Sequence, residues 1–490
     1  MIVIIDSLNT ILWNYLLVYG LLAIGLYFTV RLGFFQFLHF GEMLRSMRGT
    51  REDQSGISPF QALMVSLASR VGTGNLAGVA VALYLGGAGA IFWMWVVALL
   101  GMATAYAESS LAQLYKVRNE EDQYRGGPAF YIARGLNARR AGCAFSICLA
   151  LSFGLVFNAV QANSIADAME GAFGASKILV GVVLAILSAM IIFGGIRQIA
   201  RVAEIVVPFM AIGYLLLAVY VLIVNIGQVP AILGQILSSA FGLDQAAGGV
   251  TGGIAAAMLN GVKRGLFSNE AGMGSAPNIA AVATTSHPSS QGFVQALGVF
   301  IDTIVICTAT AVMILLSGTL EPGSGVTGTQ LTQNAMSAHI GATGTYFIAL
   351  AVFFFAFTSI IGNYAYAESG LSFLGASTGM PILALRVLAT AMVVWGAYAN
   401  VSTVFEAADI SMAFMAIINL VAIILLSGTV VKLTKDYFAQ KRSGQIPAFD
   451  PAAYPELEGK IDRDIWSQSF LKERQELDER AAGSLASTLH

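Results

Sequence analysis

Apolar residues form long stretches along nearly the whole chain between residues 8 and 430. Each stretch approaches the roughly 20 residues that an α-helix needs to cross the hydrocarbon core of a membrane. Eleven spans are predicted, at residues 8–30, 60–82, 90–113, 142–166, 178–196, 203–225, 250–283, 291–317, 344–372, 379–398 and 401–430. The pattern therefore predicts an all-α polytopic membrane protein with eleven transmembrane helices.

The second span contains residues that an ordinary membrane helix excludes. Its centre reads Arg70-Val71-Gly72-Thr73-Gly74-Asn75. An arginine at membrane depth is costly, and glycine weakens a helix by about 1 kcal/mol relative to alanine. Irregular backbone survives at that depth only where protein or a wet cavity surrounds it. We therefore predict a helix break here that forms part of a binding site.

The seventh span is interrupted in the same way. It carries basic, acidic, amide and hydroxyl residues together with glycines and a proline, namely Lys263, Arg264, Ser268, Asn269, Glu270, Gly272, Gly274, Ser275 and Pro277. We expect two half-helices around a break near residues 266–274. Interrupted spans in corresponding positions of two halves are typical of secondary transporters built as inverted repeats. The halves would be residues 59–225 and 250–430, with the first span as an extra helix.

Charged residues orient the chain. Lys and Arg gather in the loops 31–59, 114–141 and 197–201 and in the C-terminal tail, whereas the loops 226–249 and 318–343 contain none. Positive charge marks the cytoplasmic side. We expect a multi-pass protein of a bacterial-type inner membrane, with its N-terminus outside and its C-terminus in the cytoplasm.

Segments outside the spans are expected to be peripheral. Residues 127–140 read as an amphipathic helix on the cytoplasmic surface, and residues 229–241 as an outer interfacial or re-entrant helix. The transmembrane domain would cover residues 1–435. Residues 436–490 would form a flexible or peripheral cytoplasmic tail.

Composition agrees with a membrane transporter and disfavours other classes. Of the 490 residues, 57% are hydrophobic and only 11% are charged, against about 25% charged residues in soluble domains. The sequence has no P-loop, HExxH or GxSxG motif, and its three cysteines and four histidines show no metal-ligand spacing. We expect no enzyme activity, no nucleic-acid partner and no ATPase subunit, and we leave the oligomeric state open.

The first break offers N–H donors that suit an anion and carbonyl oxygens that suit a cation. Amide N–H groups freed at a break, next to the N-terminus of a half-helix, suit an anion such as a carboxylate. These amides belong to Gly72, Thr73, Gly74 and Asn75. The carbonyls released near Ala68 and Val71 suit a small hard cation. The alternative is a glycine-rich surface for close helix packing, which does not account for Arg70 or Asn75.

Two unbroken spans add candidate contacts. In span nine, Thr358 and Ser359 offer oxygen ligands of the kind that Na⁺ prefers, although such hydroxyls often bond to a carbonyl of their own helix. In span four, Phe153, Phe157 and Gln161 fall on one helical face and could present a wall and an amide to an amino acid. A polar contact between helices is an equal alternative for that face.

Acidic residues recur at membrane depth, where unpaired charges are prohibitive. They are Glu108, Glu204, Glu270, Asp302, Glu368, Glu406 and Asp409. Candidate partners are Arg70, Lys263, Arg264 and Arg386. We hypothesise that Arg70 and Glu270 form an ion pair that joins the two breaks.

Four motifs resemble the alanine/glycine:cation symporter family, also called sodium:alanine symporters. They are GGAGAIFWMWVVALLG at 86–101, GTGNLAGVA at 72–80, VQANSIA at 160–166 and RGLFSNEAGMGSAP at 264–277. The resemblance covers essentially all eleven spans and leaves out only the tail. It implies a LeuT-like core of 5+5 inverted repeats with one added N-terminal helix. It also implies Na⁺-coupled uptake of small neutral amino acids.

The resemblance also implies roles for individual residues. The substrate carboxylate would meet the amides of residues 72–75, and Gln161 with Phe157 would line the pocket. The second break would add Ser268, Asn269 and Gly272 to the same pocket. Sodium would bind the carbonyls of Ala68, Val71 and Phe355 and the hydroxyls of Thr358 and Ser359.

One residue departs from the family pattern. Many members resembling the alanine carriers have a tryptophan where this chain has Asn363. A smaller amide would leave a roomier and more polar pocket. Alanine or glycine remains the expected substrate, with glutamine as the alternative. H⁺ in place of Na⁺ is the nearest variant for the coupling ion, and an amino-acid sensor with the same pocket is the rival from another class.

Overall fold

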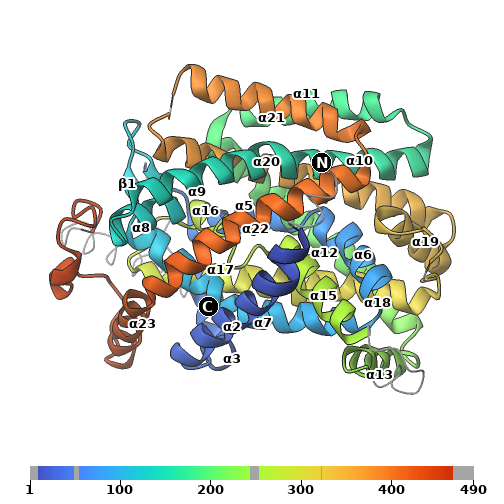
Figure 1. Ribbon diagram of the computed structural model, residues 1–490, viewed down its shortest axis with the longest axis horizontal. Helices are drawn as coiled ribbons and strands as arrows, with labels where there is room; N and C mark the ends of the chain where they lie inside the picture. Colours follow the sequence, from blue (N-terminus) through green and yellow to red (C-terminus); the bar gives the residue numbers. More distant parts are fainter. Residues whose placement is uncertain (1–8, 49–54, 243–252, 322, 377, 467–490) are drawn as a thin grey trace, which may run out of the picture.

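A computed structural model of the chain describes residues 9–48, 55–242, 253–321, 323–376 and 378–466 and is helical almost throughout (Figure 1). The described helices up to residue 240 are η1 Ile11–Leu17, α2 Val18–Arg31, α3 Phe35–Leu38, α4 Phe40–Ser46, α5 Pro59–Arg70, η2 Gly74–Gly78, α6 Val79–Gly86, α7 Gly89–Leu114, α8 Pro128–Gly135, α9 Arg139–Leu151, η3 Ser152–Val156, α10 Phe157–Phe173, α11 Lys177–Ile192, α12 Gly195–Val224 and α13 Val229–Ala240. The helices after residue 252 are α15 Gly253–Asn269, α16 Pro277–Ala280, α17 Pro288–Val299, η4 Phe300–Cys307, α18 Thr308–Ser317, α19 Gly328–Ile340, α20 Thr343–Phe373, α21 Met380–Tyr398, α22 Val401–Leu425, α23 Ser427–Arg442, η5 Pro451–Ala453 and η6 Pro455–Leu457. The described strands are β1 Val117–Arg118 and β2 Tyr124–Arg125, which pair antiparallel.

Eight described helices are long and apolar enough to cross a membrane, and they match eight of the eleven predicted spans. The other three predicted spans correspond to shorter helices. They are the two interrupted spans and the fifth span, which becomes α11 with 16 residues. Residues 8 and 250–252 of the predicted spans, and residues 467–490 of the tail, lie outside the described residues. The prediction of a polytopic all-α protein is confirmed, whereas the count of eleven remains a prediction.

The first break lies at residues 71–73, where it was predicted. Helix α5 begins with a capping box, in which the Ser58 hydroxyl accepts from the Gln61 amide while the Gln61 side chain accepts from Ser58 N. It ends at Arg70, and Val71 leaves helical geometry with ψ 84°. The chain resumes as the π-helical turn η2 and then as α6. Such turns are rare and frequent at functional sites.

The second break spans residues 270–276, close to the predicted residues 266–274, and the half-helix that follows it is very short. Helix α15 ends at Asn269, and the next regular element, α16, has only four residues. The reason lies in the backbone: Glu270, Gly272 and Gly274 have φ of 59°, 92° and 80°. Left-handed residues at alternate positions cannot continue a right-handed helix. The break is therefore near its predicted position, and the second helical piece beyond it is a single turn.

A short parallel β-bridge joins the segment before the first broken span to the segment after the second break. This bridge lies on the side that was predicted to be cytoplasmic. Ile57 pairs with Ala283, with Ile57 N donating to the Val282 carbonyl at 3.2 Å and Thr284 N donating to the Ile57 carbonyl at 2.9 Å. The residue before the first broken span is thus tied to the residues that follow the second. This bridge fixes α5 and the second break relative to each other.

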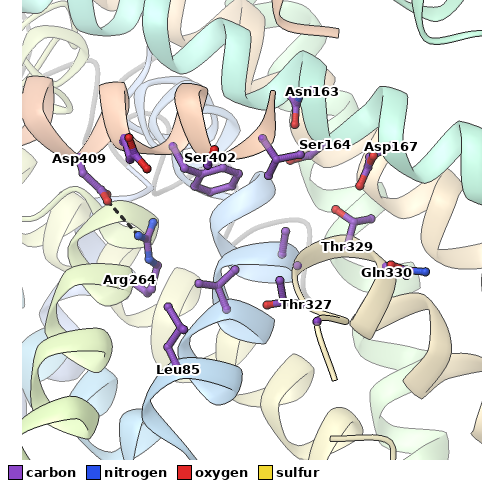
Figure 2. A pocket seen from close by; sticks show the side chains of 17 residues that line it. Leu85, Asn163, Ser164, Asp167, Arg264, Thr327, Thr329, Gln330, Ser402 and Asp409 are labelled. Carbon is purple, nitrogen blue, oxygen red and sulfur yellow. Dashed lines mark hydrogen bonds and ion pairs between the residues drawn. The ribbon is translucent and has the colours of Figure 1, made fainter. Parts of the chain in front are cut away.

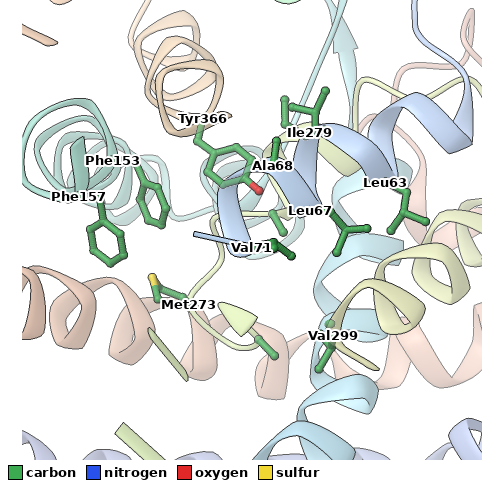
Figure 3. Packing of buried hydrophobic residues seen from close by; sticks show 14 of the residues in the cluster. Leu63, Leu67, Ala68, Val71, Phe153, Phe157, Met273, Ile279, Val299 and Tyr366 are labelled. Carbon is green, nitrogen blue, oxygen red and sulfur yellow. The ribbon is translucent and has the colours of Figure 1, made fainter. Parts of the chain in front are cut away.

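The interior is packed around α5. Figure 3 shows Leu63 and Leu67 of this helix, and Val71 directly after it, among the buried apolar residues, with Phe153 and Phe157 on one side and Val299 on another. Glycines let α15 approach α7 closely. A Cβ atom at Gly261 would lie 2.3 Å from the Ala90 carbonyl oxygen. Small residues at such crossings are the usual means of close helix packing in membranes.

The peripheral segments are helical but differ from the predicted amphipathic helix. Helix α8 ends at Gly135, and α9 begins at Arg139 and continues into the fourth span, so residues 127–140 are not one helix. Five of the eight α8 residues are buried, and the Tyr131 hydroxyl donates to Asn419 of α22. Helix α13 agrees with the predicted helix at 229–241 and packs against the start of α7.

The described part of the tail lies against the body of the protein. Phe449 N donates to the Ser286 carbonyl at 2.9 Å, and the Ser286 hydroxyl donates to the Pro447 carbonyl at 2.9 Å. Trp466 is buried, and the Lys116 ammonium lies 5.1 Å from its ring centre. These contacts connect the tail to the loop that follows the second break.

Candidate functional site

Two amides of the first break, those of Gly72 and Thr73, donate to side-chain oxygens, whereas Asn75 N donates to the Gly72 carbonyl at 3.2 Å. Gly72 N donates to Asn75 Oδ1 at 2.9 Å, and Thr73 N donates to Gln161 Oε1 at 2.9 Å. The Gln161 oxygen thus stands where one oxygen of a carboxylate would accept. The structure brings together span two and the predicted amide of span four.

The two breaks are in direct contact. A Cβ atom on Gly74 would lie 3.0 Å from Ser268 Cα and 3.2 Å from the Phe267 ring. A side chain at Gly74 would therefore fit only if its neighbours shifted by a few tenths of an ångström, so glycine suits this close approach. Of the predicted residues in the second break, Ser268 is the one placed against the first break.

A carboxylate in span eight bridges the two breaks. Asp302 Oδ1 accepts from Asn75 Nδ2 at 2.7 Å, and Asp302 Oδ2 accepts from the hydroxyls of Ser268 at 2.8 Å and Thr303 at 2.7 Å. Asp302 is fully buried. Sequence reasoning counted it among the buried acids without giving it a place in the site. An acid at the centre of an apolar span was the available signal.

Four oxygens of the predicted sodium ligands lie close together beside the first break. The Ser359 hydroxyl lies 2.9 Å from the Ala68 carbonyl and 3.0 Å from the Phe355 carbonyl, and the Thr358 hydroxyl lies 2.9 Å from the same Phe355 carbonyl. Both hydroxyls therefore also bond to their own helix, which was the stated alternative. Hard oxygen donors without sulfur or imidazole suit Na⁺, so these residues fit that ion.

Gly72 connects the two halves of the candidate site. A Cβ atom there would lie 2.2 Å from Ser359 Oγ and 2.8 Å from Gln161 Oε1. The oxygen cluster and the amide donors are thus separated by one residue that lacks a side chain. Val71, whose carbonyl was predicted as a sodium ligand, is the residue where the backbone leaves the helix.

Aromatic rings form a wall beside the breaks. Phe157 stacks on Phe153 with ring centres 4.5 Å apart, and on Phe267 with ring centres 5.2 Å apart. Phe405 of α22 continues the series at 5.8 Å from Phe267. Phe157 is therefore part of a wall built from four elements, η3, α10, α15 and α22.

Three predicted pocket residues have their polar groups engaged elsewhere. Asn363 donates to Asn158 Oδ1 at 3.1 Å and accepts from the Ser69 hydroxyl at 2.6 Å. The Asn269 amide donates to Thr303 Oγ1 at 3.2 Å. Gly272 N donates to Glu108 Oε1 at 3.3 Å, on the side of the break away from Gly72. The structure does not bring these polar groups to the amides of the first break.

The expected ion pair between Arg70 and Glu270 is absent. Among the described residues, no carboxylate oxygen lies within 4.0 Å of an Arg70 nitrogen; the Arg70 Nη1 atom donates to the Gln295 carbonyl at 3.3 Å. Glu270 instead contacts the hydroxyls of Ser69 at 2.9 Å and Ser275 at 2.5 Å. The hypothesis is therefore wrong: a serine one residue before Arg70 contacts the acid, and Arg70 turns toward α17.

Two of the other candidate cations pair with an acid, and Glu368 pairs with Arg125, which was not among the expected partners. Arg386, the remaining candidate, donates to the Tyr364 hydroxyl at 3.1 Å. Asp409 of α22 pairs with Lys263 at 2.6 Å and with Arg264 at 3.0 Å. Glu368 of α20 pairs with Arg125 of β2 at 2.9 Å. The first cluster joins α15 to α22, and the second joins the loop before α8 to α20.

A cavity of about 520 Å³ lies next to the aromatic wall (Figure 2). Figure 2 shows Arg264 and Asp409 on one side of it and Ser164, Asp167 and Thr329 on another. Its lining residues come from η2, α6, α10, α15, α19, α22 and the segment before α19, and none of them is a predicted site residue. Ser164 and Arg264 lie about one helical turn from Gln161 and Ser268, so the cavity adjoins the breaks from one end of the molecule.

The architecture defines the class of the protein. A solved structure with similar coordinates is that of MhsT in complex with L-phenylalanine, which matches with a TM-score of 0.56 over 79% of this chain and 93% of that chain at 14% identity. That likeness shows the fold, which is the fold of LeuT-type transporters. The chain is a multi-pass, all-helical membrane protein with this architecture.

Sequence comparison identifies the family. A model described as the sodium:alanine symporter family matches residues 1–451, and the chain belongs to this family. It is 50% identical to the amino-acid carrier protein AlsT of Bacillus subtilis over 91% of this chain and 94% of the relative. It is 47% identical to the probable sodium/glutamine symporter GlnT of the same organism over 91% and 92%. It is 39% identical to the sodium/alanine symporter AgcS of Methanococcus maripaludis over 88% and 96%.

Membership in this family has direct consequences. The chain is a symporter for amino acids and not an enzyme, as the absence of catalytic motifs predicted. The resemblance recognised in the four sequence motifs is confirmed over the transmembrane part of the chain.

Proposed function

We propose that this protein imports a small neutral amino acid, alanine or glycine, together with Na⁺. The carrying observation is at Gly72, where an added Cβ would lie close to both Ser359 Oγ of the oxygen cluster and Gln161 Oε1, which covers the Thr73 amide. A carboxylate at the amides and a cation at the oxygens would lie close together. When they are bound close together in a low-dielectric site, the substrate carboxylate and Na⁺ stabilise each other, so the binding of one favours the binding of the other.

The predicted residues other than Asn269, Gly272 and Asn363 have a role in this proposal. The substrate carboxylate accepts from the amides of the first break, displacing Gln161 Oε1 from Thr73 N. The residues contributing amides are Gly72, Thr73, Gly74 and Asn75. The sodium ligands are the carbonyls of Ala68, Val71 and Phe355 and the hydroxyls of Thr358 and Ser359. Phe157 and Ser268 bound the substrate on its other sides.

The proposed topology follows from the charge distribution. We place the N-terminus outside, the C-terminus in the cytoplasm, eleven spans in the membrane and an inverted repeat of residues 59–225 and 250–430. Residues 1–435 form the transport domain, and residues 436–490 form a cytoplasmic tail. The membrane potential then drives each Na⁺ inward with about 2.3 kcal/mol per 100 mV.

The cavity on the outer side of the proposed site and the contacts on its cytoplasmic side fit transport by alternating access. In the proposed orientation, the 520 Å³ cavity opens on the outer side, beyond Phe267 and the Arg264–Asp409 pair. The Arg125–Glu368 pair lies toward the cytoplasmic side. Inward release requires the inner contacts to separate while the outer cavity closes, as broken-helix transporters do by rocking one bundle against the other.

The substrate is alanine or glycine in this proposal, with glutamine as the second candidate. The family description and AgcS favour alanine, whereas the more similar GlnT favours glutamine. Asn363 supports glutamine less than the sequence suggested, because Ser69 and Asn158 already bind its amide. Competition by unlabelled alanine, glycine, serine and glutamine against labelled alanine decides between them.

Uptake into proteoliposomes tests the proposal as a whole. An inward Na⁺ gradient should drive accumulation of labelled alanine, and a pH gradient alone should not. Accumulation driven by the pH gradient alone would replace Na⁺ by H⁺ as the coupling ion. Substrate binding without any flux would instead support a sensor.

A further inference from the structure

Three buried carboxyl groups interact electrostatically with Arg70 without forming an ion pair with it. Glu108 lies on α7, Glu270 in the second break and Asp302 in η4, and each interacts electrostatically with the Arg70 guanidinium. Tyr366 of α20 also faces Glu270. One cation cannot neutralise three carboxylates, and buried ions without compensation are strongly disfavoured. The hydrogen-bond donors around each carboxyl group indicate which of them holds a proton.

Glu108 and Asp302 are surrounded by donors. Glu108 Oε1 accepts from Gly272 N, and Glu108 Oε2 accepts from Asn419 Nδ2 at 2.7 Å. The orientation of the Asn419 amide is fixed, because its Nδ2 also donates to the Gly272 carbonyl at 2.9 Å. Asp302 accepts from an amide and two hydroxyls. Both groups therefore match ionised carboxylates, which accept hydrogen bonds on both oxygens.

Glu270 is different, because a chain of contacts anchored on a backbone carbonyl determines the hydrogen positions. The Gly154 carbonyl accepts from Asn158 Nδ2 at 3.1 Å, so Asn158 presents Oδ1 to Asn363 Nδ2 at 3.1 Å. Asn363 must then present Oδ1 to Ser69, at 2.6 Å. Amide orientations are assigned from such networks.

The single proton of the Ser69 hydroxyl is therefore used by Asn363. Ser69 Oγ also lies 2.9 Å from Glu270 Oε1, and a hydroxyl has only one proton to donate. The remaining hydrogen bond requires a donor on Glu270. The other oxygen, Glu270 Oε2, accepts from the Ser275 hydroxyl at 2.5 Å. The absence of an Arg70–Glu270 ion pair has the same explanation, because a neutral acid does not attract the guanidinium.

We infer that Glu270 binds a proton at Oε1 and that Ser69, Glu270 and Ser275 form a proton-binding site joining the two breaks. With Glu270 neutral, Arg70 faces two carboxylates instead of three. Loss of the proton would place a carboxylate against an oxygen that has no hydrogen to donate to it. The Ser69–Glu270 contact between α5 and the second break would then be lost, and the new charge would attract Arg70.

The consequence for transport rests on the proposed function. The contact between the breaks is present while Glu270 is protonated and is lost as the pH rises through its titration. Transport that needs this contact should therefore decline on the alkaline side. Glu270→Gln preserves the contact at every pH, because its Nε2 donates to Ser69 and its Oε1 accepts from Ser275.

Infrared spectroscopy of the purified full-length protein tests the proton directly, without transport. A protonated carboxyl group gives a carbonyl band above the amide I band. The wild-type band should disappear in Glu270→Gln and persist in Glu108→Gln, the matched control that alters a buried acceptor-only carboxylate of the same region. A band that persists in Glu270→Gln, or no band in the wild type, overturns the inference. Failure of Glu270→Gln to fold also overturns it, because glutamine supplies the same donor and acceptor.

The pH profile of Na⁺-driven alanine uptake tests the consequence. Above the titration, the wild-type rate should fall by up to about tenfold per pH unit, whereas the Glu270→Gln rate should stay flat. Equal profiles in the two proteins overturn a role for this proton in transport. Lack of Na⁺-driven uptake in the wild type would refute the proposed function and would leave the infrared result to decide the proton site.

Discussion

Asn75 and Asp302 join the first break to span eight. The Asn75 Nδ2 atom lies 2.7 Å from Asp302 Oδ1 and 3.1 Å from the Asp302 carbonyl oxygen, while the Asn75 Oδ1 atom accepts from Gly72 N. One amide side chain therefore fixes both the backbone of the break and a buried carboxylate. Through Ser268, the same carboxylate reaches the second break. This arrangement holds the two breaks in contact.

Asp302→Asn should reduce Na⁺-driven alanine uptake by at least about tenfold. The NH₂ group of the new asparagine would face an N–H or O–H donor and could not accept its hydrogen bond. Hydrogen bonds to charged groups contribute about 1.5–3 kcal/mol to stability. Initial rates in proteoliposomes, normalised to protein content, measure the effect. Asp450→Asn is the control, because Asp450 caps a turn in the tail, where asparagine caps equally well. Wild-type rates in Asp302→Asn would contradict the bridging role.

Ser359→Ala should raise the Na⁺ concentration for half-maximal uptake by about tenfold, the equivalent of about 1.4 kcal/mol. The substitution removes the hydroxyl that lies against both the Ala68 and the Phe355 carbonyls. At saturating Na⁺ the alanine KM should change little. Thr390→Val is the matched control, since that hydroxyl donates only to carbonyls of its own helix. An unchanged Na⁺ dependence in Ser359→Ala would exclude Ser359 as a ligand.

Gly72→Ala should abolish alanine binding without removing a polar group. The added Cβ would lie 2.2 Å from Ser359 Oγ and 2.8 Å from Gln161 Oε1, closer than non-bonded atoms approach. Gly20→Ala is the control: a Cβ at that helical position meets no atom within 4 Å, and alanine favours the helix by about 0.5–1 kcal/mol. Equilibrium binding of labelled alanine to detergent-purified protein distinguishes the two. Binding by Gly72→Ala at wild-type affinity would place the substrate elsewhere.

The orientation of the chain can be measured with cysteine substitutions at two exposed positions. Gln330→Cys, at the rim of the cavity, should react with a membrane-impermeant maleimide added to intact cells. Ser443→Cys, just after α23, should react only after the cells are opened. The wild type, with its native cysteines, gives the background. The reverse pattern would invert the proposed topology.

The docking of the tail should weaken in acid. His287 Nδ1 accepts from Ser289 N at 3.1 Å, so its Nε2 carries the proton and faces Asp436 at 3.3 Å. Burial lowers the pKa of His287, against the opposing effect of Asp436. A lowered histidine pKa contributes stability above the ordinary value of about 6.5 that is lost as the pH falls through the value in the folded protein. Hydrogen exchange of residues 447–466 should therefore accelerate in acid.

The control for this effect is His287→Asn, which keeps the helix cap and cannot be protonated in this range. Its exchange rates, corrected for the intrinsic effect of pH on amide exchange, should not depend on pH. The same acid-induced acceleration in His287→Asn would assign the effect to another group.

Much of the fold could be predicted from hydropathy, because bilayer thickness fixes the length of an apolar span. The first break could be located within a few residues, since Gly72 and Gly74 flank Thr73 in a stretch that also carries Arg70. The position of the second break could be predicted from the sequence, but the path of its backbone could not. Its course depends on Glu270 adopting a positive φ, a conformation that local sequence does not favour for glutamate.

Partners of buried polar residues were harder to predict, because they depend on how spans far apart in sequence pack together. The sequence shows that residue 302 is an aspartate, but it does not show that the side chain of Asn75, 227 positions away, donates a hydrogen bond to it. Arg70 and Glu270 were expected to pair on charge alone. The structure places Ser69 between the two breaks instead, and Asn363 is engaged by that serine and by Asn158 rather than left facing an open pocket.

The central claim is that the amino acid and Na⁺ bind next to each other at the first break. Calorimetric titration of alanine into the purified protein, in Na⁺ and in K⁺ at equal ionic strength, tests it most directly. Binding should be detected in Na⁺ and weakened by at least about tenfold in K⁺, and alanine should raise the apparent Na⁺ affinity by the same factor, as thermodynamic linkage requires. Equal alanine affinity in the two salts would contradict a shared site.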